Sequence, residues 1–256
     1  MDYKKLKNSY RKYKNKHKLT LKQFDIPKYK KIYKTVIIVP FRDNKFQDRK
    51  KQLEKFIPYF QKMFKGNVDI LVVEQSNDNK KFNRGALLNI GMLLAMARGY
   101  KVMISHDVDL LPDKAAREFY LTYPYHPVHL GNMWKEKYTY DRFIGGALSM
   151  NYKDIVRSNG YPNDFWGWGG EDDALGIRLS KKNIPILKPT KGQIKEMKHE
   201  DTKGIKELVN PTIIESVMED DKKWKNNGIN SVKFKKLKEH NYSDNASKIT
   251  VELLKN

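Results

Sequence analysis

The sequence contains no cysteine, no long apolar run and comparatively few acidic residues. The absence of cysteine from all 256 residues excludes a disulfide framework and zinc sites built on thiolates, and it favours a reducing compartment. No stretch approaches the roughly 18 apolar residues that a membrane-spanning helix needs. The first residues, Met1 to Lys5, lack the apolar core of a signal peptide. We therefore expect a soluble, cytoplasmic protein that meets a membrane, if at all, only at its surface.

Acidic residues are outnumbered, because 51 Lys and Arg face 30 Asp and Glu and give a net charge of +21. About half of the excess lies in residues 1–34, which hold 13 basic residues against Asp2 and Asp25. Such a segment is either a solvated basic arm or a nucleic-acid-binding tail, and no zinc-finger, RNP or KH signature follows it. We expect a basic N-terminal arm over residues 1–34, a single domain over residues 35–256, and no specific nucleic-acid partner.

Apolar runs alternate with helical patterns along the rest of the chain, which is typical of an α/β fold. Runs rich in β-branched residues predict buried strands at 35–40, 68–75 and 101–105. Apolar residues at helical spacing predict helices at about 48–64, 82–96, 152–158, 172–182 and 210–225. Further strands or short elements are expected at 127–130, 143–150, 184–187, 231–234 and 249–254.

Two acidic motifs indicate a functional site. The stretch Phe-Trp-Gly-Trp-Gly-Gly-Glu-Asp-Asp at 165–173 places three adjacent carboxylates behind two indoles and three glycines. Like charges repel and burial penalises them, so this pattern indicates acids held for chemistry or for hydroxyl-rich ligands, although an acidic helix start is the ordinary alternative. Asp107 and Asp109 follow a predicted strand and share one of its faces, which suits Mn²⁺ or Mg²⁺ bridging a diphosphate.

Three basic or metal-binding side chains complete the candidate set. Arg42 ends the first predicted strand, where α/β sheets bind ligands, so it is a candidate phosphate contact. Arg84 begins a predicted helix and can face an anion there, an ordinary surface cation being the alternative. His199 is a candidate metal ligand only because Asp109 needs partners, since a lone histidine is more often structural.

In this order the motifs resemble those of the β1,4-galactosyltransferase family, glycosyltransferase family 7. The matching stretches, over about residues 35–235, are Val39-Pro40-Phe41-Arg42, 82–91, 107–112, Gly145-Gly146, 159–173 and His199. The resemblance, which leaves residues 1–34 outside, implies a GT-A fold that binds a nucleotide sugar on a mixed central sheet flanked by helices. It further implies inverting, Mn²⁺-dependent transfer of a hexose, with galactose favoured, from a UDP-sugar to a saccharide hydroxyl, forming a β1,4 linkage.

The resemblance also assigns roles to individual residues. Nucleotide-sugar binding falls to Pro40, Phe41, Arg42, Arg84, Asp107, Val108, Gly146, Trp168 and Glu171. Acceptor binding falls to Trp168, Asp172, Asp173, Tyr140 and Phe143, with Asp172 as the general base. Metal binding falls to Asp109, His199 and either Glu196 or Asp201.

The chain departs from the family pattern at three places. Asn44 stands where the family has a second arginine, which Arg49 matches only across an insertion. The third metal ligand becomes a carboxylate, a harder ligand that makes Mg²⁺ possible beside Mn²⁺. Phe143 stands where a tyrosine helps to select the donor sugar, which keeps UDP-N-acetylgalactosamine or another UDP-hexose as alternatives.

Two further expectations concern class and setting. A glycan-binding protein without turnover is the alternative from outside the enzymes, although a metal site together with a base argues against it. The family's animal members are tethered in the Golgi and carry disulfides, so a chain with neither is expected to be a soluble bacterial or viral type. Its basic arm could then contact an anionic membrane or polymer.

Overall fold

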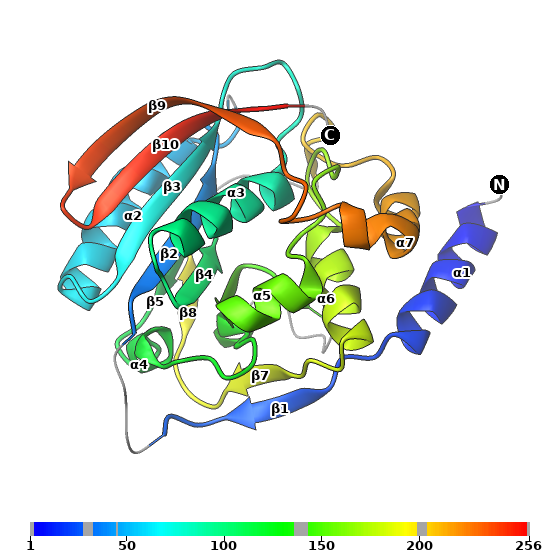
Figure 1. Ribbon diagram of the computed structural model, residues 1–256, viewed down its shortest axis with the longest axis horizontal. Helices are drawn as coiled ribbons and strands as arrows, with labels where there is room; N and C mark the ends of the chain where they lie inside the picture. Colours follow the sequence, from blue (N-terminus) through cyan, green and yellow to red (C-terminus); the bar gives the residue numbers. More distant parts are fainter. Residues whose placement is uncertain (1–2, 28–32, 45, 136–142, 199–203, 255–256) are drawn as a thin grey trace.

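A six-stranded mixed sheet forms the centre of the protein in the computed structural model, which describes residues 3–27, 33–44, 46–135, 143–198 and 204–254. Its strand order is β6-β4-β2-β3-β10-β9 (Figure 1). The four inner strands run parallel, and β6 and β9 lie antiparallel at the two edges. The strands are β2 (Thr35–Phe41), β3 (Asp69–Gln75), β4 (Val102–His106), β6 (Ala147–Asn151), β9 (Phe234–Ser243) and β10 (Ala246–Leu253).

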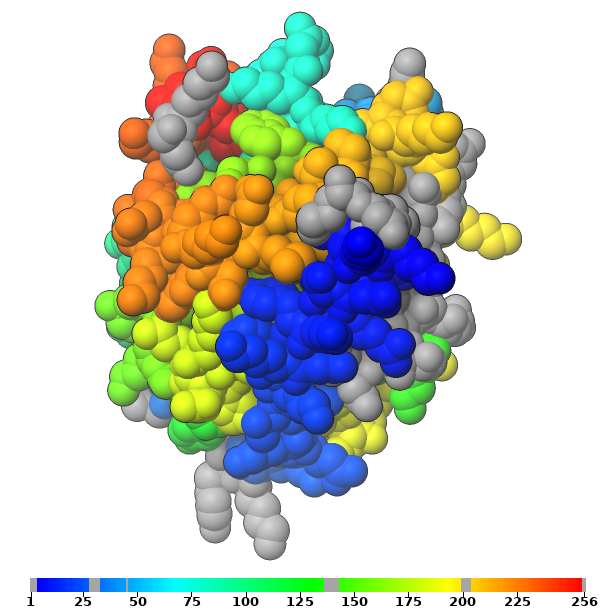
Figure 2. Space-filling model, turned by 90° about the vertical axis from the view of Figure 1, so that its right-hand side faces the viewer, coloured from blue at the N-terminus to red at the C-terminus, as the bar shows by residue number. Residues whose placement is uncertain are grey.

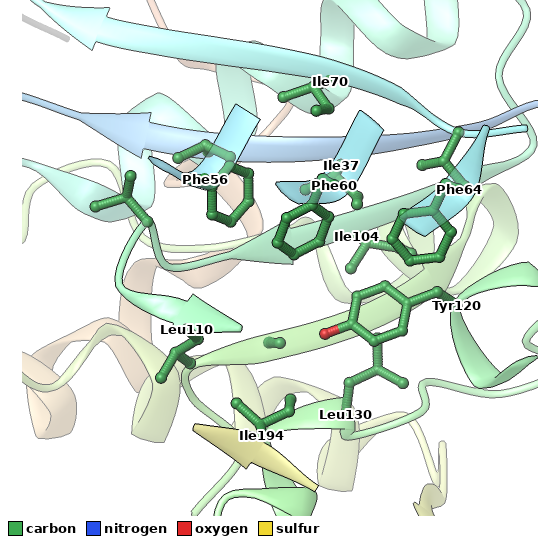
Figure 3. Close-up of a cluster of buried hydrophobic side chains, with 14 of the residues drawn as sticks. Ile37, Phe56, Phe60, Phe64, Ile70, Ile104, Leu110, Tyr120, Leu130 and Ile194 are labelled. Carbon is green, nitrogen blue, oxygen red and sulfur yellow. The ribbon is translucent and has the colours of Figure 1, made fainter. Parts of the chain in front are cut away.

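Helices cover both faces of this sheet because β2 is apolar on both of its sides. Ile37 and Val39 point to the face covered by α2 (Arg49–Phe64), where Phe56 and Phe60 pack against them (Figure 3). Ile38 and its alternate neighbours point to the other face, which α3 (Arg84–Ala97) covers with an almost wholly apolar surface. This two-sided burial confirms the expected α/β fold, a mixed sheet flanked by helices.

Shorter elements surround the sheet. Two small sheets pair β1 (Leu21–Phe24) with β7 (Ile186–Pro189) and β5 (Leu110–Pro112) with β8 (Ile194–Glu196). The remaining helices are α4 (Arg117–Leu121), α5 (Tyr152–Ser158), α6 (Glu171–Lys181) and α7 (Ile213–Lys223), with 3₁₀ turns η1 (Leu130–Met133) and η3 (Trp224–Asn226). Among the described residues, no helix is both long enough and apolar enough to cross a bilayer.

The described part of the basic N-terminal segment is not the solvated arm that we expected. Residues Tyr3–Lys16 form helix α1, whose Leu6 is only 6% exposed, and β1 pairs in parallel with β7. Figures 1 and 2 show α1 lying against α7 at the surface. The many charges hid an amphipathic pattern, in which Leu6, Tyr10 and Tyr13 share one face at helical spacing while most of the lysines are exposed.

Other boundaries shift by a few residues, and one expected strand is wrong. Residues 127–130 form no strand, because only Val128 makes isolated bridges, to Ser149 and Leu187, before η1 begins. The expected strand at 184–187 lies at 186–189, and that at 231–234 begins instead at Phe234 and continues to Ser243. Exposed, lysine-rich β9 carries too little apolar alternation to be recognised from the sequence.

Candidate active site

One pocket of about 320 Å³ gathers the predicted site residues beyond the carboxyl ends of β2 and β4. Strand β2 delivers Arg42 and strand β4 delivers Asp107, as parallel strands of an open sheet do at their ligand-binding edge. All fourteen predicted site residues that the structure describes line it: Pro40, Phe41, Arg42, Arg84, Asp107, Val108, Asp109, Phe143, Gly146, Trp168, Glu171, Asp172, Asp173 and Glu196. Tyr140, His199 and Asp201 lie outside the described residues.

Arg84 lies at the centre of the acidic side of this pocket. Its Nε donates to Asp107 Oδ1 at 2.9 Å, and its Nη1 donates to Asp172 Oδ1 at 3.1 Å and to Glu171 Oε1 at 3.4 Å. Asn83 caps the start of α3 by accepting from the backbone of Ala86, which fixes where Arg84 leaves the helix. One guanidinium therefore joins carboxylates from β4 and α6, instead of facing a free anion.

Burial changes the protonation equilibria of these carboxyl groups. Loss of solvation raises the pKa of Glu171, with repulsion from Asp172 adding to it. Loss of solvation also raises the pKa of Asp172, and the nearby Arg84 partly offsets that rise. Burial on its own would lower the pKa of Arg84, but Asp107, Asp172 and Glu171 raise it well above the ordinary value. A raised pKa makes Asp172 a stronger base than an ordinary aspartate.

Backbone conformation brings Asp172 close to the Gly145-Gly146 turn. A side chain at Gly145 would collide with Asp172 Oδ2 and with the ring of Phe143, so a larger residue there would displace one or both side chains. Gly170 has a φ of 96° at the start of α6, a conformation that other residues rarely adopt, and it turns the chain so that Glu171 and Asp172 enter the first helical turn. The glycines of the motif therefore place its carboxylates.

Trp168 is held in the pocket wall by its main chain. Its N–H donates to Leu208 O at 2.6 Å, and its carbonyl accepts from Asn210 N at 3.0 Å. This partly exposed residue lines the same pocket as Phe143, Asp172 and Asp173. A flat aromatic face next to carboxylates is a suitable surface for a sugar ring, whose apolar face and hydroxyl groups need both.

Two carboxylates that line the pocket, Asp109 and Glu196, are candidate oxygen ligands for a divalent metal. Strand β5 pairs Leu110 with Glu196 of β8, and Met197 N donates to Asp109 O at 2.7 Å, so Asp109 and Glu196 lie on neighbouring segments of the chain. Arg49 Nη1 contacts Asp109 Oδ2 at 2.5 Å, which shows that the carboxylate already accepts a cation at this point. Hard oxygen donors of this kind fit Mn²⁺ or Mg²⁺.

Arg42 lies at the opposite end of the set, beside the loop that follows β3. Its Nη1 donates to Lys80 O at 2.8 Å and lies 3.6 Å from Asp78 Oδ1, while burial lowers its pKa below the ordinary value. Pro40 and Phe41, which precede it, also line the pocket. The sequence therefore identified the pocket side of β2 correctly, but it did not indicate that Asp78 would accompany Arg42.

Sequence reasoning missed two sets of contacts. Arg49 contacts Asp109, a pairing between helix α2 and the β4–β5 turn that no local spacing indicates. Tyr10 and Lys14 of α1 both contact Asp173, although we expected that segment to be solvated. The apolar spacing in α1 was the available signal, and the charge run obscured it.

Two family models match the chain. A model for the N-terminal region of glycosyl transferase group 7 matches residues 4–122, and a model described as the N-terminal domain of galactosyltransferase matches residues 125–200. The chain belongs to glycosyltransferase family 7. The first match begins at residue 4, so the expectation that residues 1–34 lie outside the family resemblance was wrong.

Relatives of this family 7 chain are similar over most of its length. Rat β-1,4-galactosyltransferase 3 is 31% identical over 210 residues, which cover 80% of this chain and 52% of the relative. Rat β-1,4-galactosyltransferase 4 is 31% identical over 217 residues, which cover 83% of this chain and 62% of the relative. The chain thus spans only about half to three fifths of the length of these relatives.

Solved structures show the same GT-A fold. The catalytic domain of Drosophila β1,4-galactosyltransferase 7, in complex with xylobiose, has a TM-score of 0.72 and 29% identity, and the match covers 88% of this chain and 96% of that one. A mutant of the Drosophila enzyme, solved with manganese, UDP-galactose and xylobiose, gives the same TM-score at 27% identity. The mixed sheet of this family 7 chain is therefore that of a nucleotide-sugar-binding fold.

Proposed function

We propose that this chain is an inverting, metal-dependent galactosyltransferase that transfers galactose from UDP-galactose to a saccharide hydroxyl, forming a β1,4 linkage. The observation that carries the proposal is the convergence of fourteen predicted residues on one pocket, with Asp172 among them. The Drosophila relative with manganese, UDP-galactose and xylobiose supports the donor, the metal and the acceptor class.

The geometry supports a division of the pocket into donor and acceptor sides. Arg42, with Pro40 and Phe41, would hold the UDP moiety at the end of β2, and Gly146 would let the donor sugar approach the backbone. Trp168 and Asp173 would hold the acceptor sugar and exclude water, which otherwise competes for the donor. Tyr140 and Phe143 remain predicted acceptor contacts, of which the structure describes only Phe143.

Asp172 would act as the general base. Its raised pKa favours uptake of the acceptor hydroxyl proton, and general base catalysis of this kind is worth typically ~10²- to 10⁴-fold. Arg84 would keep this carboxylate oriented through the 3.1 Å contact and keep it ionised. Asp109 and His199, with either Glu196 or Asp201 as the third predicted ligand, would hold Mn²⁺ or Mg²⁺, which would stabilise the charge on the diphosphate when bound.

The direct test is UDP release from a panel of UDP-sugars, with Mn²⁺ or Mg²⁺ and with saccharide acceptors that include xylobiose. Release from UDP-galactose, lost on chelation and in Asp172→Asn but retained in Asp244→Asn, would support the proposal. Asp244 is a matched control because it is exposed in the β9–β10 turn and does not line the pocket. Release only from UDP-N-acetylgalactosamine or another UDP-hexose would change the donor.

UDP binding without release from any donor would favour the alternative of a glycan-binding protein. That outcome would be read from calorimetric titration of the wild type with UDP and Mn²⁺, followed by the same saccharides. The burial that raises the pKa of Asp172 argues against it, because binding a sugar does not require a carboxylate with a raised pKa.

We also propose that the basic segment, residues 1–34, contacts an anionic membrane or polymer. Such contact would suit a cytoplasmic enzyme that acts at the surface of a membrane or on a polymer. The lysines on the outer side of α1 are exposed, among them Lys5, Lys12 and Lys16. Deleting the segment would also remove the buried Leu6 and the β1–β7 pairing, so charge removal is the cleaner test. Replacing the three lysines by glutamine should weaken binding to phosphatidylserine vesicles at low salt; unchanged binding would contradict the proposal.

A further inference from the structure

The carboxylate of Asp173 is held by a helix that lies more than 150 residues away in the sequence. Tyr10 Oη donates to Asp173 Oδ2 at 2.7 Å, and Lys14 Nζ donates to Asp173 Oδ1 at 2.6 Å. Asp173 itself lines the pocket beside Asp172. Helix α1 therefore reaches the edge of the pocket where Trp168 and the two adjacent aspartates lie.

Packing fixes α1 in this position. The rings of Tyr10 and Tyr13 pack against a buried cluster drawn from the acidic motif, α6 and α7, namely Phe165, Ala174, Ile177 and Val217. Leu6, two turns before Tyr13, is also buried. Figure 2 shows the same face of the protein, with α1 lying along its surface beside α7. Because Ala174 follows Asp173 in the first turn of α6, α1 and this carboxylate are held by one cluster.

The contacts control both the direction and the charge of Asp173. Two donors on different oxygens leave the carboxylate little freedom to rotate, and charge-assisted hydrogen bonds are the stronger kind. The ammonium group of Lys14, which is 19% exposed on its side chain, compensates a carboxylate adjacent to Asp172. A protein that used Asp173 only as a solvated helix-start acid would need neither contact, because the helix dipole already favours a carboxylate there.

We propose that α1 supports the acceptor subsite from outside the pocket and that Tyr10 and Lys14 position Asp173 to bind the acceptor sugar. The inference rests on the proposed function, in which Asp172 and Asp173 face the acceptor. Tyr10 and Lys14 are positioning residues because they act through Asp173. They determine how well the saccharide is held, whereas the donor side of the pocket is built from β2, α3 and β4.

The test compares Lys14→Met, Lys14→Arg and Tyr10→Phe with the wild type, using UDP-galactose, Mn²⁺ and the best saccharide of the acceptor panel. We expect the acceptor KM to rise about tenfold in Lys14→Met, which loses a charge-assisted contact, and severalfold in Tyr10→Phe. Lys14→Arg should recover most of the loss. The dissociation constant of UDP should stay unchanged throughout. Lys12→Met is the matched control, since Lys12 is an exposed lysine on the same helix.

A double-mutant cycle separates positioning from a merely structural contact. In an Asp173→Asn background, Lys14→Met should raise the acceptor KM by less than twofold, because the group through which it acts has been altered. An acceptor KM that stays at the wild-type value in folded Lys14→Met would overturn the inference. So would a parallel loss of acceptor and UDP affinity with a lowered melting temperature, which would indicate general destabilisation.

Failure of the proposed function has a different signature. If the wild type itself transfers no sugar to any acceptor, the proposed function fails and the inference fails with it. If the wild type transfers galactose and only the α1 variants behave like the control, the function stands and the inference is wrong.

Discussion

Replacing Arg84 by methionine should move the acid limb of the pH profile to higher pH. Arg84 is the cation that contacts Asp107, Glu171 and Asp172 together, at 2.9, 3.4 and 3.1 Å. Methionine keeps much of the length and apolar volume of the side chain but removes its charge. The three carboxylates would then face one another without a counter-ion, and protonation would become the easiest way to relieve their repulsion.

The size of the effect follows from the distance. Two unit charges about 4 Å apart interact by roughly 4 kcal/mol at an effective dielectric constant of about 20, and about 1.4 kcal/mol corresponds to one pH unit. Water that enters beside methionine would recover part of that interaction, so we expect a move of about 1 to 2 pH units. The sign is fixed, because Arg84 lowers the pKa of Asp172 and its removal must raise it. A base that stays protonated to higher pH loses activity from the acid side.

The assay is kcat for galactosyl transfer from pH 5 to 9 at saturating UDP-galactose, Mn²⁺ and acceptor. Arg42→Met is the matched control, since Arg42 lines the same pocket but contacts Lys80 and Asp78 instead of the pocket carboxylates. We expect this control to weaken UDP binding without moving the acid limb. An acid limb that stays in place in Arg84→Met, with only UDP affinity reduced, would refute the reasoning and restrict Arg84 to phosphate binding.

Three further predictions concern other parts of the structure. Arg178→Met should lower the free energy of unfolding by about 3 to 5 kcal/mol in urea titrations. Arg178 is fully buried, and its Nη2 lies 2.6 Å from Asp220 Oδ1, so its removal leaves the buried Asp220 carboxylate without its cation. A loss below about 1 kcal/mol would contradict this. Arg49→Met should bind Mn²⁺ severalfold more tightly in the absence of UDP-sugar, as measured by electron paramagnetic resonance, because the guanidinium no longer competes for the Asp109 carboxylate. Weaker Mn²⁺ binding would instead show that Arg49 helps to hold Asp109 in place as a metal ligand. Gly145→Ala should reduce kcat by at least about tenfold with little change in UDP affinity, because the added methyl group displaces the Asp172 carboxylate; wild-type kcat would show that the turn can yield.

The parts of the fold that the sequence predicted well are those where burial dominates the choice of residue. Strand β2 is buried along its whole length, so its apolar run fixed the strand regardless of distant contacts. Helix α1 and strand β9 are the opposite case. In α1 three apolar residues decide the packing while lysines dominate the composition, and in β9 pairing with β10 holds a strand that is exposed at nine of its ten positions.

The candidate site also has a predictable and an unpredictable part. The sequence predicted which residues lie there because each motif is at the end of a strand or the start of a helix, where local spacing determines which way a side chain points. The pairings were not, because Arg49 with Asp109 and Lys14 with Asp173 join residues that are 60 and 159 positions apart. At such separations no local sequence pattern indicates which carboxylate a given basic residue will contact. The packing of α1 and α2 against the rest of the protein determines these pairs.

These pairings also explain how a protein with a net charge of +21 tolerates a pocket rich in acids. Five of the six carboxylates that line the pocket contact a cation: Arg84 contacts Asp107, Glu171 and Asp172, Arg49 contacts Asp109, and Lys14 contacts Asp173. The carboxylates outnumber these cations, so a bound divalent metal would reduce the excess negative charge. The basic surface would then attract a UDP-sugar from a distance, and the metal would give its diphosphate a place to bind among the acids. Because Arg49 contacts Asp109, a metal held by Asp109 would compete with this guanidinium for the same carboxylate.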